Sequence, residues 1–169
     1  LATANGTALA GADLDYNAFT GDVIFAAGET EKKITVTTND DDIYELDETF
    51  TLNGNVTSGK TSNTEASGTG TITDNDGAAP AISIENVTVE EGDNAVFYVT
   101  SNKVSYEDIV VNITFADGTA TNPADYGDGT PVQVTIPAGS QTSGAITFPT
   151  VDDTIFEVSE TFTVTGTVA

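Results

Sequence analysis

The chain has 169 residues and carries 27 acidic side chains against 4 Lys and Arg, a formal net charge of −23. This balance excludes binding to nucleic acid or to anionic membranes, because phosphate binding requires clustered Lys and Arg. The sequence has no Cys and no His, which excludes disulfides, Ser–His and Cys–His catalysis and the usual zinc and copper ligands. The oxygen donors that remain suit calcium.

The hydrophobic pattern predicts β-strands throughout, and no segment has the apolar spacing of a helix. In chain order, strands are expected at Glu48–Val56, Ala66–Thr73, Ile82–Val89, Asn94–Ser101, Ile109–Ala116 and Glu160–Val168. Within the fifth strand, Ile109, Val111 and Ile113 alternate with other side chains and should face the core. Turn formers such as Asp117-Gly118 separate the strands. We therefore expect an all-β fold, an immunoglobulin-like antiparallel β-sandwich.

An internal repeat is visible in the sequence. Gly6-Thr7-Ala8 recurs as Gly118-Thr119-Ala120, 112 positions later, and the pattern D-D-x-I-x-E-x-x-E-T-F that begins at Asp40 recurs at Asp152. A repeat of this length is a domain, so the chain is expected to hold about one and a half tandem repeats. Residues 1–76 would be the C-terminal part of one repeat, 77–80 a linker, and 81–169 the N-terminal and middle part of the next. The chain begins at Leu1 with no signal peptide, which indicates an internal segment.

The acidic residues cluster where strands end. The clusters are Asp13 with Asp15, Asp40–Asp42 with Glu45, Asp47 and Glu48, Asp74 with Asp76, Glu90 and Glu91 with Asp93, and then Asp125, Asp152, Asp153, Glu157 and Glu160. Carboxylates about 4 Å apart repel each other by roughly 1–4 kcal/mol per pair. A solvated acidic loop needs charge but no fixed spacing, so the repeated spacing favours a cation site. An EF-hand is excluded, because Glu45 and Thr51 stand where it needs Gly and Glu.

Three motifs in the second half together resemble a Calx-beta domain, the repeat of sodium–calcium exchangers and many large bacterial surface proteins. They are Ala124-Asp125-Tyr126, Ile136-Pro137-Ala138-Gly139, and Val151-Asp152-Asp153 followed by Phe156-Glu157-x-x-Glu160-Thr161-Phe162. The first half carries similar motifs, among them Asp15-Tyr16 and the closing Thr71-Ile72-Thr73-Asp74-Asn75-Asp76. The resemblance implies a seven-stranded sandwich that binds Ca²⁺ at one pole.

Carried over from that family, the calcium ligands lie in both repeats. In the first they are Asp15 (or Asp13), Asp40, Asp41, Asp42, Glu45, Glu48, Asp74 and Asp76; in the second they are Glu90, Asp125, Asp152, Asp153, Glu157 and Glu160. Two positions depart from the family pattern: Thr154 replaces a third Asp, and Asn75 interrupts the closing acidic triplet.

The expected function is a calcium-binding structural repeat of a secreted or cell-surface protein, with no enzymatic activity. It would be a spacer or rod segment of a bacterial adhesin, stiffened by calcium. The expected partners are calcium ions and neighbouring repeats, with no nucleic acid and no direct membrane insertion. Each half lacks strands that the other half has, so either strands are exchanged between chains in a homo-oligomer or the missing strands belong to a longer chain.

Three other functions remain open at this point. The first is a regulatory calcium-sensor domain of a membrane protein. The second is a cadherin-like adhesion module, since Asp74-Asn75-Asp76 followed by Pro80 resembles the cadherin linker, although cadherin repeats lack the D-D-x-x-x-E-x-x-E loop. The third is a carbohydrate-processing accessory domain, which needs an exposed aromatic platform. Tyr126 is expected in the core rather than on such a platform.

Overall fold

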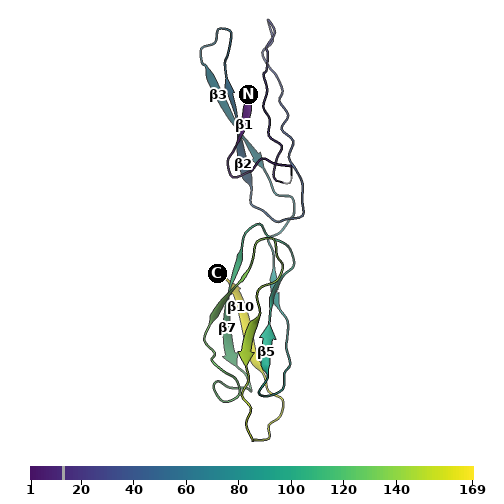
Figure 1. Cartoon of the computed structure of the whole chain (residues 1–169), viewed down its shortest axis with the longest axis vertical. Coiled ribbons are helices and arrows are strands. Elements are labelled where there is room, and N and C mark those ends of the chain that lie inside the picture. The colour runs from purple at the N-terminus through teal and green to yellow at the C-terminus, as the bar shows by residue number, and fades with distance from the viewer. Residues whose placement is uncertain (13) are drawn as a thin grey trace. The chain divides into compact units, whose positions relative to one another are not determined.

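The computed structural model describes residues 1–12 and 14–169, and the chain is all-β with antiparallel strand pairs (Figure 1). The strands are β1 (Ala2–Asn5), β2 (Glu48–Asn55), β3 (Glu65–Ile72), β4 (Ile82–Ile84), β5 (Asn94–Phe97), β6 (Val99–Ser101), β7 (Ile109–Asp117), β8 (Val132–Ile136), β9 (Ile146–Pro149) and β10 (Phe162–Val168). Among these residues there is no helix long and apolar enough to cross a membrane. The predicted all-β class is confirmed.

The chain divides into two compact units, residues 1–42 with 46–75 and residues 43–45 with 76–169. The first unit contains the sheet β1-β2-β3, with β2 in the centre. Phe50 of β2 lies opposite Gly70 of β3. The ring of Phe50 also stacks on Tyr16, with ring centroids 4.6 Å apart, and Tyr16 is fully buried. The stacking of the buried Tyr16 on the partly buried Phe50 anchors the segment around Tyr16 to the sheet.

The second unit contains the sheet β10-β7-β8 and the two pairs β4-β6 and β5-β9. Its core includes Val111 and Ile113 of β7, both fully buried, whereas Thr114 between the strand's apolar positions is exposed. The alternation predicted for this strand is therefore confirmed. Tyr126 is 2% exposed and stacks on Phe162 with centroids 4.6 Å apart, so it is a core residue as expected.

The predicted strand Asn94–Ser101 is interrupted at Tyr98. β5 before it pairs with β9, whereas β6 after it pairs with β4. Tyr98 is 47% exposed. The chain therefore leaves one strand pair and joins another at this residue, which a single apolar run does not reveal.

The predicted strand Ile82–Val89 is also shorter than expected. Only Ile82–Ile84 is paired, because β6 offers three residues opposite it. Residues 85–89 are exposed and have no regular structure. The short strands β1, β8 and β9 were not predicted from their sequences, since each spans only four or five residues.

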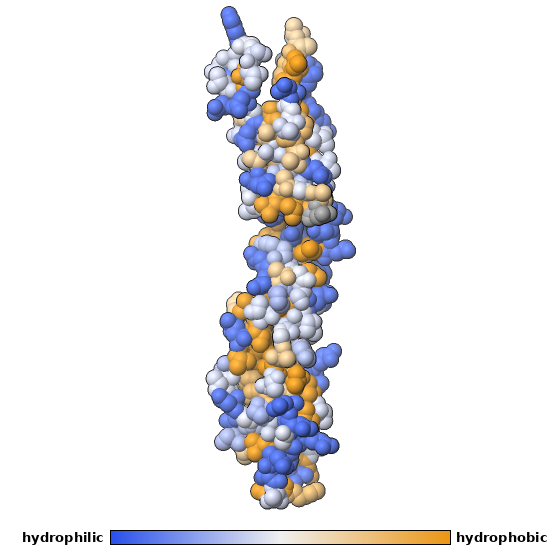
Figure 2. All heavy atoms as spheres, viewed as in Figure 1, coloured by the Kyte–Doolittle hydropathy of each residue, from blue (hydrophilic) through white to orange (hydrophobic). Residues whose placement is uncertain are grey.

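Both units leave apolar side chains on the surface, seen as orange areas in Figure 2. The segment after β9 is an example, with Ile155 66%, Phe156 93% and Val158 75% exposed. These apolar side chains face solvent although they lie within the repeated acidic motif. Their neighbours Glu157 and Glu160 instead converge with a third carboxylate, as described next.

Candidate metal sites

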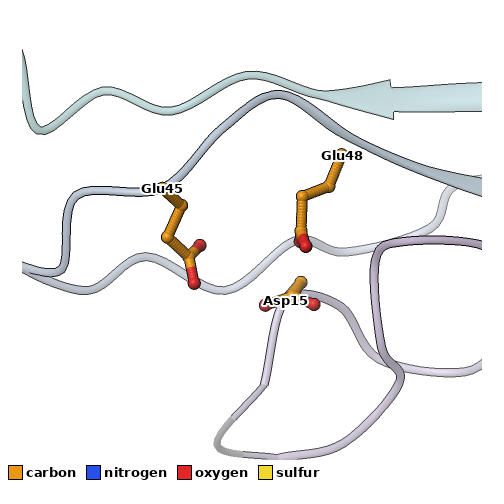
Figure 3. Close-up of side chains that lie close together, drawn as sticks. All are labelled: Asp15, Glu45 and Glu48. Carbon is orange, nitrogen blue, oxygen red and sulfur yellow. The ribbon is translucent and has the colours of Figure 1, made fainter. Parts of the chain in front are cut away.

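Two groups of three carboxylates come together. The first is Asp15, Glu45 and Glu48, whose side chains converge in Figure 3, and the second is Asp125, Glu157 and Glu160. In each group one oxygen per residue lies within 4.8 Å of the others. Two oxygens that both bind Ca²⁺ at its usual bond length lie at most about 5 Å apart. Both groups therefore fit the donor type and the spacing that calcium requires.

The two groups occupy equivalent positions of the internal repeat. Glu45 precedes β2, and Glu48 is the first residue of that strand. Glu157 and Glu160 lie 112 positions later in the sequence, just before β10. The aspartate of each group directly precedes a buried tyrosine, Tyr16 or Tyr126. The second group lies wholly within the second unit.

The loop that carries each aspartate is held by the same hydrogen bond. The backbone N–H of Leu9 donates to Asp15 Oδ2 at 2.6 Å, and the backbone N–H of Thr121 donates to Asp125 Oδ2 at 2.7 Å. Leu9 and Thr121 are themselves 112 positions apart. One carboxylate oxygen thus fixes the loop and orients the aspartate.

The tyrosine after each aspartate is anchored as well. The hydroxyl of Tyr16 donates to Asn5 Oδ1 at 2.8 Å, and the hydroxyl of Tyr126 donates to Asp117 Oδ1. Burial, together with the hydrogen bond to Asp117, raises the pKa of Tyr126 to about 12. Tyr126 therefore remains a protonated donor at any physiological pH and holds its loop against the end of β7.

The carboxyl groups of the second group are harder to ionise than free ones. The pKa values of Glu157 and Glu160 are both raised, first by partial removal from water and then by the charge of Asp125. Glu91 raises both pKa values further. Carboxylates that resist ionisation beside one another offer a cation a place that a proton would otherwise take.

These raised pKa values predict a pH dependence in the calcium-free protein. A carboxylate whose pKa is higher in the folded state binds protons more readily when folded, so its contribution to stability falls as pH rises through the interval above the unfolded pKa. We expect the protein in chelator to gain stability from Glu157 and Glu160 as pH falls from 7 to 5. Denaturant unfolding at both pH values measures this gain.

The control for this pH effect is the double variant Glu157→Gln and Glu160→Gln. It retains the rest of the acidic surface and should show a smaller gain in stability between pH 7 and pH 5 than the native chain. An equal gain in both proteins would assign the effect to the overall negative charge instead of to this group.

The other predicted ligands lie outside the two groups: Asp40, Asp41, Asp42, Asp74, Asp76, Glu90, Asp152 and Asp153. Asp40 Oδ1 accepts a hydrogen bond from the side chain of Asn75 at 2.8 Å. Asp153 Oδ1 accepts a hydrogen bond from the backbone N–H of Ile155 at 2.6 Å. The charge of Asp153 also contributes to the raised pKa of Glu157. Asp13 lies outside the described residues.

The turn formed by residues 90–93 lies beside the second group. A Cβ added to Gly92 would stand 3.0 Å from the Cβ of Asp152, and Gly92 has a φ of +82°. Glu91 is the residue of this turn whose charge acts on both Glu157 and Glu160. The sequence-based ligand set named Glu90 in this turn, and neither Glu90 nor Glu91 belongs to the group of three carboxylates.

The fold and these groups define a tandem β-sandwich protein with one acidic triad in each repeat. The family model of the Calx-beta domain matches residues 1–77 and, a second time, residues 73–166. The chain belongs to the Calx-beta domain family. No curated protein matches the chain significantly.

Proposed function

We propose that this chain is a calcium-binding structural segment of a secreted or cell-surface protein, a spacer in a bacterial adhesin with no catalytic role. The observation that carries this proposal is the recurrence of one carboxylate triad at equivalent positions of two repeats. Calx-beta domains are a calcium-related, non-catalytic family. The net charge of −23 is consistent with a cation-loaded, soluble rod and with the absence of nucleic-acid partners.

Calcium would act by mass action in this role. Extracellular modules bind calcium with dissociation constants of about 10⁻⁴–10⁻³ M, whereas sensors bind at about 10⁻⁷–10⁻⁵ M. A spacer only needs its calcium sites to be filled at the constant calcium concentration outside the cell, so sites of low calcium affinity suffice. Calorimetric affinities in the sensor range would favour the regulatory alternative instead.

The proposed stiffening is tested by a distance distribution between the repeats. Because the chain has no Cys, the variants Lys60→Cys and Ala145→Cys place two spin labels at exposed positions. We expect a narrower distribution of label distances in calcium than in chelator. Pairs of labels placed within one unit serve as the control, and equal widths between the units in both buffers would contradict the spacer role.

A further inference from the structure

The second unit has a groove beside Tyr98, where the chain passes from β5 to β6. The groove has a volume of about 330 Å³, within the range of pockets that bind small ligands or side chains. Its lining includes Glu85, Asn86 and Val87 from the segment after β4, and Val96 and Tyr98 from the strand beside it. None of these residues belongs to either carboxylate triad, so the groove is separate from the candidate metal sites.

Tyr98 points away from the core of the second unit. Its neighbours Phe97 and Val99 are 7% and 0% exposed, whereas Tyr98 is 47% exposed. Successive side chains of a strand face opposite sides, so the groove lies on the outer face of this strand. Among the described residues no other aromatic ring stacks on Tyr98. The ring is therefore available to a ligand.

A carboxylate lies on the other side of the groove. β4 pairs with β6 only as far as Ile84, which lies opposite Val99. The next residue, Glu85, is exposed and belongs to no strand, and it lines the groove together with Tyr98. Of the described residues that line the groove, Glu85 alone is charged.

These three features match the side chain of arginine. A guanidinium group stacks on an aromatic ring, and it donates two hydrogen bonds to a carboxylate. The aliphatic stem of arginine covers apolar surface, which Val87 and Val96 provide here. A lysine ammonium lacks the planar shape that allows stacking and paired hydrogen bonds at the same time.

The arginine has to come from another protein. The chain has no arginine of its own, and its basic residues are Lys32, Lys33, Lys60 and Lys103. A second copy of the chain therefore does not supply the ligand. The net charge of −23 attracts a basic partner over a long range and repels another copy.

We propose that the groove beside Tyr98 binds an arginine side chain from an exposed basic segment of another protein. The guanidinium group stacks on the ring of Tyr98 and donates hydrogen bonds to the carboxylate of Glu85. The stem lies against Val87 and Val96. This interaction goes beyond the spacer role, because it gives the segment a contact of its own with a partner.

A blocked tripeptide with arginine between two glycines tests the proposal on the intact chain. The titration is followed by NMR in excess calcium, so that the carboxylate triads are not competing sites. We expect chemical-shift changes concentrated at residues 85–87 and 96–98. The matched peptide with citrulline has the same shape without the charge, and it should bind about tenfold more weakly or worse. The lysine peptide should fall between the two.

Two variants of the protein test the assigned contacts. Tyr98→Leu keeps an apolar side chain on the surface and removes the ring, so it should weaken binding of the arginine peptide by about threefold to tenfold. Glu85→Gln keeps the shape of the side chain and should weaken binding of the arginine peptide more than that of the citrulline peptide. Phe25→Leu is the control, because it removes another exposed aromatic ring, in the first unit, and should leave the affinity unchanged.

Four outcomes would overturn the proposal. The first is the absence of shifts at Tyr98 at millimolar peptide, and the second is unchanged affinity in Tyr98→Leu. The third is equal affinity for the arginine and citrulline peptides, which would assign the groove to a neutral ligand. The fourth is a set of shifts spread over the acidic loops, which would indicate general attraction of cations to the surface.

Discussion

Removal of calcium with a chelator is expected to lower the melting temperature of the chain by roughly 10 °C or more. Each carboxylate triad holds three negative charges with oxygens within 4.8 Å of one another. Bound calcium offsets this repulsion in the folded state only, because the unfolded chain does not bring the three residues together. Differential scanning calorimetry in calcium and in chelator measures the shift.

High sodium chloride is the control for this first prediction. At 1 M salt the screening length is about 3 Å, so salt weakens general repulsion across the acidic surface. Salt should restore less of the melting temperature than millimolar calcium does. Equal melting temperatures in calcium and in chelator would refute the calcium proposal.

The second prediction is that Glu160→Gln weakens calcium binding in the second unit by about tenfold or more. The substitution keeps the shape of the side chain and removes the charge of one of the three convergent residues. Isothermal titration should then show one site retained and one lost or strongly weakened, because the group of Asp15, Glu45 and Glu48 is unchanged.

Asp128→Asn is the matched control for Glu160→Gln. It removes the same charge from a residue outside both triads, in a turn where Asp128 Oδ1 accepts the backbone N–H of Thr130 at 3.0 Å. Asn preserves that acceptor, so affinity should stay near the native value. Equal losses in the two variants would indicate diffuse attraction of counter-ions instead of a defined site.

Much of the second unit could be predicted from the sequence, because its signals are local. Alternation along Ile109–Ala116 identified the buried face of β7, and the Asp125-Tyr126 motif identified a core tyrosine beside an acidic residue. The change of strand pairing at Tyr98 was not predicted. It depends on which strands lie beside the chain, and an uninterrupted apolar run carries no information about them.

The same limit applies to the candidate sites. The repeated spacing identified Glu157 and Glu160, which converge with Asp125. Motif matching also named Asp40, Asp41 and Asp42, which lie outside the first triad. Neighbours in sequence share a loop, but only some of their side chains turn toward a common point, and that direction is set by packing of the loop on the sheet.

The hydrogen bonds from Leu9 to Asp15 and from Thr121 to Asp125 have a consequence for how fast the sites respond. Because each aspartate loop is already closed by its own backbone and by a buried tyrosine, little conformational entropy is lost when an ion arrives. Preorganised sites of this kind load without a slow folding step. In the proposed calcium-binding role, the repeats would therefore lose and regain calcium as the surroundings change while the β-sheets beneath them stay intact.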